Sequence, residues 1–180
     1  MTTGGIPQLI EARTLAARGV VLKGRLDVAK MPRLSAAIVA AEQPVDVNCA
    51  FFCDEEGRYV LNLQVSGEFR VDCQRCLSAM PVELSAQTQL AVVWTDEQAA
   101  QLPARYDPLL AEAETDLWSV VEDELLLALP AFSYHADTHC GENADIAVPD
   151  SGVQPETEKK TNPFDVLAAL KEDTVEDPKL

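Results

Sequence analysis

The chain has 180 residues, of which 47% are hydrophobic, so it is long enough for one domain with a buried core. No apolar run reaches the roughly 20 residues that a membrane span needs, and the N-terminus lacks the charged start and apolar stretch of a secretory signal. The net charge of −16 disfavours broad contact with nucleic acid, because such binding rests on neutralisation of phosphates by Lys and Arg. We therefore expect a cytoplasmic protein whose acidic surface either attracts basic proteins or only confers solubility.

The charge is unevenly distributed. Residues 1–95 contain nine Lys or Arg and ten Asp or Glu, whereas residues 96–180 contain five and twenty. Within the first part, residues 1–33 are mildly basic. A basic partner would therefore meet mainly the C-terminal half of the chain, and RNA mainly the N-terminal region.

The first half of the chain predicts a helix followed by β-strands. Apolar residues at helical spacing cover residues 7–18, and Gly19 follows as a stop. Alternation of apolar and polar residues then predicts half-buried strands, with a short helix at 32–41 between the first two. The expected strands are 20–28, 45–54, 58–73 and 82–94. Because the last three are long and follow one another, we expect an antiparallel meander with one solvent-exposed face.

The pattern becomes helical after the last strand. Residues 95–102 predict a short helix, and Asp116 is a suitable N-cap for a longer helix at 117–129 that ends before Pro130. The fold class is therefore α+β, with helices packed on the meander in a single domain at 1–140.

The C-terminal residues differ in composition from this domain. Residues 141–161 are rich in Gly, Pro, Ser, Asp and Glu, and predict a disordered acidic linker. Asn162 then fits a helix N-cap and Pro163 the first helical position. An apolar stripe follows, so residues 162–172 predict a short amphipathic helix.

Cys73 and Cys76 form a CxxC pair between two predicted strands. A thioredoxin-like redox motif needs a βαβ context, so this position disfavours redox chemistry. A CxxC turn also presents two thiolates to a zinc ion, and His135, His139 and Cys140 are the other clustered ligand types. The zinc site predicted in this way consists of Cys73, Cys76, His139 and Cys140. A purely structural role for the pair, in the core and in a tight turn, stays open as an alternative.

Residues that could carry catalysis are scarce. The sequence has no Gly-rich phosphate loop, GxSxG or HExxH motif. The acidic run Glu122, Asp123 and Glu124 points in different directions on a helix, so a solvated face is the simpler interpretation. Cys49 and Cys53 fall on the apolar face of a strand and are expected in the core. We expect no enzymatic activity.

Several short motifs occur in order between roughly residues 45 and 171. They are CQRC at 73–76, TDEQA at 95–99, LPxxYxP at 102–108, VEDELLLALP at 121–130, HC at 139–140 and NPFxxLxxL at 162–170. Together they resemble the YceD family of large ribosomal RNA subunit accumulation proteins. The resemblance implies a bacterial, cytosolic, non-enzymatic protein that supports normal levels of 23S ribosomal RNA. Many Gram-positive relatives carry more cysteines in the C-terminal part, where this chain keeps only His139 and Cys140.

Three hypotheses for the mechanism follow. The first is an assembly factor that binds a basic ribosomal protein or a pre-50S particle through acidic residues. Its expected partner surface comprises Arg75, Glu122, Asp123, Glu124, Asn162, Pro163, Phe164 and Leu167. The second is direct binding of precursor ribosomal RNA by the basic N-terminal region together with Arg70 and Arg75. The third is a zinc- or redox-dependent regulator that uses Cys73 and Cys76. No membrane and no small-molecule substrate are expected.

Overall fold

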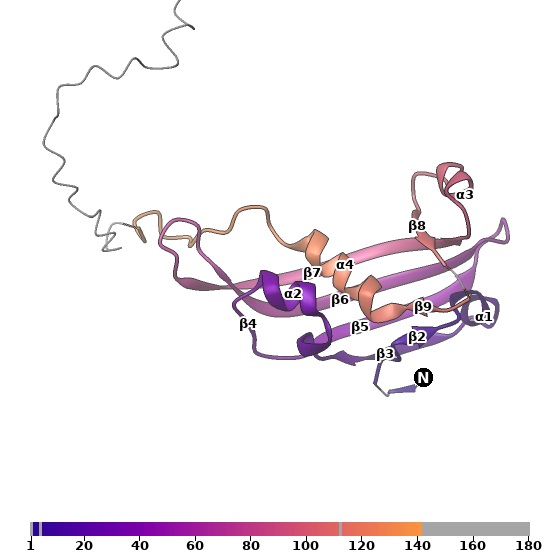
Figure 1. The fold of residues 1–180 in the computed structure, drawn as a ribbon, viewed down its shortest axis with the longest axis horizontal. Coiled ribbons are helices and arrows are strands. Elements are labelled where there is room, and N and C mark those ends of the chain that lie inside the picture. The colour runs from indigo at the N-terminus through magenta and orange to yellow at the C-terminus, as the bar shows by residue number, and fades with distance from the viewer. Residues whose placement is uncertain (1, 4, 112, 142–180) are drawn as a thin grey trace, which may run out of the picture. The chain divides into compact units, whose positions relative to one another are not determined.

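The computed structural model describes residues 2–3, 5–111 and 113–141, which form one large β-sheet, a small sheet and several helices (Figure 1). The strands of the large sheet are β1 (Thr2–Thr3), β3 (Val21–Leu26), β4 (Ala40–Ala41), β5 (Val45–Cys53), β6 (Tyr59–Asp72), β7 (Ala79–Val93) and β8 (Asp107–Leu110). β2 (Leu9–Ile10) pairs with β9 (Thr115–Asp116). The helices are α1 (Ala12–Ala17), α2 (Pro32–Ala37), α3 (Asp96–Ala100) and α4 (Leu117–Ala128), with a 3-10 turn η1 (Val28–Lys30).

The large sheet has the strand order β1-β3-β5-β6-β7-β8, and β4 pairs with β6 off this path. The central pairs β3–β5, β5–β6 and β6–β7 are antiparallel, whereas the edge pairs β1–β3 and β7–β8 are parallel. The longest ladder joins β6 to β7 in unbroken register from Val60 opposite Ala91 to Asp72 opposite Ala79. The predicted α+β class with a mainly antiparallel sheet is therefore confirmed.

Several predicted boundaries are wrong. The helix predicted at 7–18 begins only at Ala12, because Leu9 and Ile10 pair with β9 as a strand. The helix predicted at 32–41 ends at Ala37, and the extended backbone of Ile38 leads into β4. The four predicted strands are present with shifted ends, but the short strands at the sheet edges were not predicted. The linker predicted at 141–161, apart from Gly141, and the helix predicted at 162–172 lie outside the described residues.

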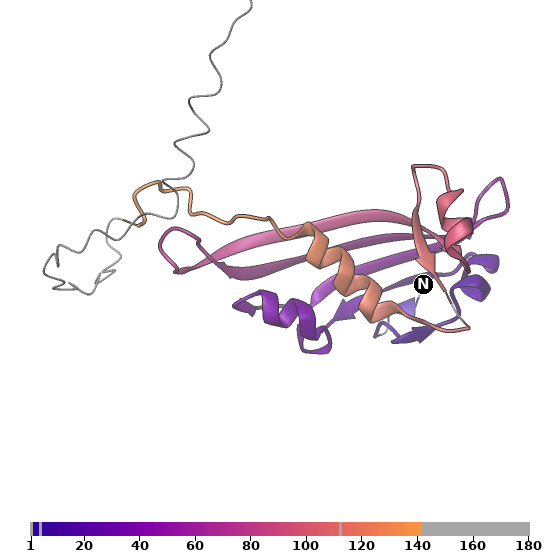
Figure 2. The ribbon, with the colours of Figure 1, turned by 45° about the horizontal axis from the view of Figure 1, so that its top comes forward.

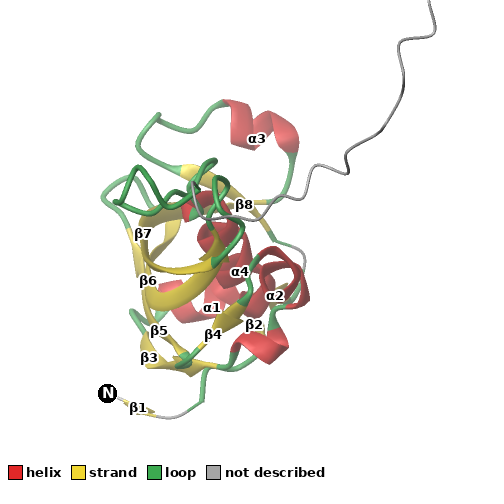
Figure 3. Cartoon of the chain, turned by 90° about the vertical axis from the view of Figure 1, so that its left-hand side faces the viewer, coloured by secondary structure: helices red, strands yellow, loops and turns green. Residues whose placement is uncertain are grey.

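One face of the sheet carries the core. Figures 2 and 3 show α4 and α2 lying across this face, and α1 packs against β5 and β6. The apolar residues that alternate along β5 and β6 are buried here, together with the apolar stripe of α4. The largest fully buried side chains include Phe51, Leu61, Leu63, Phe69, Leu117, Val121 and Leu125. No helix in the described ranges has the length and apolarity that crossing a membrane requires.

The opposite face of the sheet is polar. Its residues include Asn48, Gln64 and Gln87, which line an open hollow of about 1300 Å³. One end of this face is covered by the segment that carries α3, where Val60, Ala91 and Tyr106 form a second buried cluster. The helices of the core and the α3 segment thus lie on different sides of the sheet.

Glu122 joins α4 to α2. Glu122 is 3% exposed, and its carboxylate accepts hydrogen bonds from the backbone N–H groups of Arg33 at 2.6 Å and Leu34 at 3.0 Å. These are free donors in the first turn of α2, so Glu122 supplies the cap that α2 lacks in its own sequence. The interpretation of the acidic run as a solvated face is wrong for Glu122. Asp123 pairs with the Arg33 guanidinium at 2.6 Å, and Glu124 accepts a hydrogen bond from Thr88.

Candidate metal centre

The connection between β6 and β7 is a tight turn that contains the CxxC pair. The N–H of Cys73 donates to the carbonyl of Ser78 at 2.9 Å, and the N–H of Leu77 donates to the carbonyl of Cys73 at 2.8 Å. Leu77 has a φ of 58°, a left-handed conformation that a leucine rarely adopts. This conformation turns the chain directly after Cys76. Within the turn, the backbone N–H groups of Arg75 and Cys76 point toward the Cys73 sulfur.

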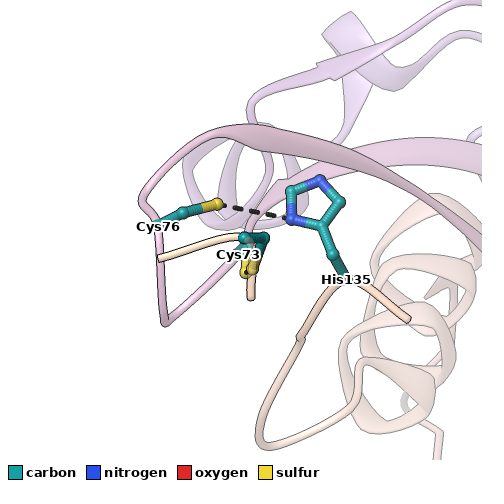
Figure 4. A group of neighbouring side chains, drawn as sticks. Cys73, Cys76 and His135 are labelled. Atoms are coloured by element: carbon teal, nitrogen blue, oxygen red, sulfur yellow. Dashed lines mark hydrogen bonds between the residues drawn. The ribbon is translucent and has the colours of Figure 1, made fainter. Parts of the chain in front are cut away.

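The segment after α4 returns to this turn. Pro130 follows the helix, and three residues later the carbonyl of Ser133 accepts a hydrogen bond from the N–H of Gln74 at 2.9 Å. This contact brings His135 beside the turn. Figure 4 shows the His135 ring directed at the Cys76 sulfur, and its Nδ1 lies 3.4 Å from that atom.

Arg75 holds the next part of this segment. Its Nη1 donates to the carbonyl of Asp137 at 2.9 Å and lies 3.6 Å from the Cys140 sulfur, while its guanidinium stacks on Tyr134. Cys140 is thereby placed 3.9 Å from Cys73, sulfur to sulfur.

Four ligand atoms therefore converge from two segments that are far apart in the sequence. The sulfurs of Cys73, Cys76 and Cys140 and a ring nitrogen of His135 all lie within 4.8 Å of one another. In tetrahedral zinc with Zn–S bonds of about 2.3 Å, neighbouring sulfurs are about 3.8 Å apart. The observed spacing and the Cys₃His donor set both fit a structural zinc ion, in which protein ligands fill all four positions.

The thiols of this group differ in acidity. Burial opposes ionisation of Cys73, but N–H donors of Cys76, Arg75 and His135 outweigh it and lower its pKa to about 5. Burial raises the pKa of Cys140, and the neighbouring Cys73 sulfur raises it further. Ionisation of Cys73 is thus favoured, whereas a second anion beside it is disfavoured. A divalent cation would remove this conflict, because metal ligation requires thiolates.

The predicted set differs from this group at one position. Cys73, Cys76 and Cys140 lie together as predicted ligands, but the imidazole among them belongs to His135. His139 lies outside the group, with Nδ1 3.2 Å from the Thr138 hydroxyl and 3.6 Å from the Asp137 carboxylate. Both histidines are near Cys140 in the sequence, so spacing alone did not distinguish them. The Gln74–Ser133 hydrogen bond distinguishes the two histidines, because it fixes the chain two residues before His135 and so places His135 beside the turn.

The two remaining cysteines have different environments. Cys49 is fully buried, as predicted, and burial raises its pKa to about 12. Cys53 is exposed, so the prediction that it belongs to the core is wrong. It is the last residue of β5, next to the turn to β6, and its sulfur lies 3.7 Å from the carbonyl of Ala16 in α1. Neither thiol belongs to the candidate centre.

The residues expected to bind a partner lie in several places. Arg75 belongs to the candidate centre, and Glu122 is buried as a cap of α2. Asp123 is exposed and Glu124 half-buried. The remaining predicted partner residues lie outside the described ranges. They are Asn162, Pro163, Phe164 and Leu167.

The fold and the site define a small α+β protein with a candidate metal centre between a β-hairpin and the segment after its last helix. The family described as large ribosomal RNA subunit accumulation protein YceD matches residues 61–171, a range that includes all four candidate ligands. A curated relative from Haemophilus influenzae with this same description is 35% identical over 146 residues, which cover 79% of this chain and 83% of the relative. The chain belongs to the YceD family. No solved structure matches it.

Proposed function

We propose that this chain is a non-enzymatic, cytoplasmic factor that supports accumulation of the large ribosomal RNA subunit by binding a basic ribosomal protein or a pre-50S particle. The family membership supports the role in ribosomal RNA accumulation. The net charge of −16 supports a basic partner, because opposite net charges favour association.

The arrangement of the basic residues is the observation that carries the choice of a protein partner. Arg25 pairs with Asp46 at 3.0 Å, and Arg70 with Glu42 at 3.5 Å. Arg33 binds the carboxylates of α4 and therefore lies on the helical side of the sheet. Each pair reduces the positive charge that an RNA phosphate would meet. Three of the arginines expected to bind RNA are thus already paired with carboxylates of this chain.

The Cys₃His group supports a second, compatible proposal. Zinc bound by Cys73, Cys76, His135 and Cys140 would fasten the segment after α4 to the β6–β7 turn. The site would then be structural, and removal of the metal would release a surface next to Arg75. The location of Cys73 in a turn between strands supports this role over a thioredoxin-like redox role, which uses a helix N-terminus.

Crosslinking in cells, followed by identification of the crosslinked molecules, tests the choice of partner. We expect crosslinks to basic proteins of the large subunit, together with reduced 23S ribosomal RNA in cells that lack the gene. Crosslinks to precursor ribosomal RNA alone would overturn the proposal. Such a result predicts salt-sensitive binding of purified protein to a ribosomal RNA fragment, and loss of that binding in Lys23→Glu, Arg25→Glu protein.

A further inference from the structure

We propose that the free edge of β7 binds an extended, basic segment of a partner protein, which adds a strand to the sheet. This inference rests on the proposed function and specifies the surface and the chemistry of the partner. β7 extends from Ala79 to Val93, but β8 pairs only with its last part, from Leu90 to Val93. In the described part of the chain, residues 79–89 have a strand neighbour on the β6 side alone (Figure 1).

The register shows which backbone groups face outward along this edge. The carbonyl of Val93 accepts a hydrogen bond from Ala111, on the side away from β6, and the carbonyl of Ser78 faces β6. Successive residues of a strand point their backbone groups to opposite sides, and the β6–β7 register has no bulge. The N–H and C=O groups of Glu83, Ser85 and Gln87 therefore point outward. An added strand can pair with all of them.

Pro81 marks one limit of the edge. It occupies an outward position by the same alternation, and there its missing N–H costs no hydrogen bond within the sheet. β8 marks the other limit at Leu90. The region in between fits a partner strand of about five residues, which is an ordinary strand length.

The charges beside this edge favour a basic occupant. Glu83 lies directly opposite Glu68 in the β6–β7 ladder, and like charges in such a pair are destabilising. Neither carboxylate has a hydrogen-bond or ion-pair partner within the described ranges. Both line a hollow of about 270 Å³ on the polar face. A Lys or Arg on an added strand would reach Glu83 and relieve this repulsion.

The helical side of the edge offers a second contact. Glu124 of α4 bonds to Thr88 of β7, so this face of the helix borders the edge strand. Leu127 lies three residues further on the same helix face and is 80% exposed. Side chains of an added strand alternate between the two faces of the sheet, so an apolar residue next to each basic residue would pack toward Leu127.

A second copy of this chain is a poorer occupant. Pairing two β7 edges would bring together two chains that each carry a charge of −16. Net repulsion opposes that association and favours a basic partner.

Binding of synthetic peptides to the full-length protein tests this inference. The probes are decapeptides with alternating Lys and Thr, the same Lys–Thr sequence with methylated backbone nitrogens, and alternating Glu and Thr. The N-methylated peptide has the same charge and side chains as the Lys–Thr peptide, but it has no N–H groups to donate the backbone hydrogen bonds of an added strand. We expect the Lys–Thr peptide to bind at least about tenfold more tightly than either of the others. Equal binding of the Lys–Thr peptide and its N-methylated form would overturn the inference.

NMR of the backbone amides locates the bound peptide. Adding the Lys–Thr peptide should shift the amide signals of Glu83, Ser85 and Gln87 more than those of Leu84 and Ala86, which face β6. Equal shifts in both groups, or shifts confined to another surface, would contradict an added strand at this edge.

Two variants test the edge directly. Ser85→Pro removes one outward donor without breaking a bond to β6, and it should weaken Lys–Thr binding about tenfold. Ser85→Thr keeps the donor and should bind like the wild type. Glu83→Lys should weaken Lys–Thr binding and reduce the preference for it over the Glu–Thr peptide, and this outcome does not depend on how well the proline variant folds. An unchanged preference in Glu83→Lys protein would overturn the inference.

Crosslinking in cells separates this inference from the proposed function. If wild type crosslinks to basic large-subunit proteins and folded Ser85→Pro protein does so equally, the edge is not the binding site and the proposed function stands. If the wild type gives no such crosslinks although the peptide results are positive, the proposed function fails.

Discussion

Different side-chain contacts hold the turns at the two ends of β6 to distant segments of the chain. At the end where β5 turns into β6, the Asp54 carboxylate accepts hydrogen bonds from the backbone and the guanidinium of Arg58 and from the hydroxyl of Tyr106. At the other end, where β6 turns into β7, Cys73 and Cys76 meet His135 and Cys140. In both places a distant segment is fastened to a turn. One fastening uses an ion-pair network and the other uses three thiols and an imidazole.

The two ends differ in whether the protein itself supplies a partner of opposite charge for each ionised side chain. Asp54 has a cationic partner 2.7 Å away, and its side chain is only 6% exposed. Tyr106 also packs against Val60 and Ala91, so apolar burial supports the polar contacts. At the thiol end, ionisation of Cys73 disfavours ionisation of Cys140. A cation would neutralise the thiolates of Cys73 and Cys140, as the Arg58 guanidinium neutralises the Asp54 carboxylate.

The proposed zinc ion predicts the largest effect: its removal should loosen the end where β6 turns into β7 and leave the other end unchanged. With a chelator, we expect residues 130–141 to detach from the β6–β7 turn, because structural zinc supplies folding free energy. Hydrogen exchange should become at least about tenfold faster in peptides covering 73–79 and 130–141, and stay unchanged near Asp54. Cys73→Ser, Cys76→Ser protein should exchange rapidly with or without chelator. Unchanged exchange in chelator-treated wild type would show that protein contacts alone hold this end.

Asp54→Ala should have the next largest effect, at the opposite end. It leaves the Arg58 N–H and the Tyr106 hydroxyl without their acceptor, and we expect the free energy of unfolding to fall by about 3 kcal/mol. Urea unfolding at neutral pH measures this change. Metal content should stay at the wild-type level, and its loss would contradict the independence of the two ends.

The same carboxylate predicts a pH dependence. Burial opposes ionisation of Asp54, but hydrogen bonds from Arg58 outweigh it and lower its pKa. Its contribution to stability is therefore complete above the pKa of an unfolded aspartate, and is lost as the pH falls through the lowered value. The stability difference between wild type and Asp54→Ala should accordingly shrink in acid. A difference that is constant with pH would contradict this role.

Arg105→Ala should have the smallest effect. The Arg105 side chain is 55% exposed and lies 3.4 Å from Glu56 and 3.8 Å from Asp54. Exposed pairs of this kind contribute about 0–1 kcal/mol, and salt weakens them. Arg18→Ala is the matched control, because Arg18 is exposed and has no ion pair in the described ranges. A loss as large as that of Asp54→Ala would mean that Arg105, rather than Arg58, is the main partner of Asp54.

Local patterns predicted the long elements well. The alternation in β5, β6 and β7 and the Asp116 cap of α4 are short-range features, and the structure contains these elements near their predicted bounds. Leu9 and Ile10 were assigned to a helix because their spacing fits one, but they pair with β9 more than 100 residues later. Such partners are set by tertiary structure, which a local pattern does not contain.

The candidate centre was predictable to a similar degree. The CxxC pair and the cluster of His135, His139 and Cys140 identified both halves of the site. The choice between the histidines depends on where the chain after α4 crosses the turn, and one backbone hydrogen bond sets that position. The predicted solvent exposure of Glu122 was also wrong. Its burial depends on the backbone N–H groups at the start of α2, which the sequence pattern of its own helix does not contain.

Metal analysis of protein purified without a histidine tag tests the central claim most directly. Wild type should contain about one zinc per chain, His135→Ala should lose it, and His139→Ala should retain it. Wild type without metal, or loss of zinc in His139→Ala with retention in His135→Ala, would contradict a centre formed by Cys73, Cys76, His135 and Cys140.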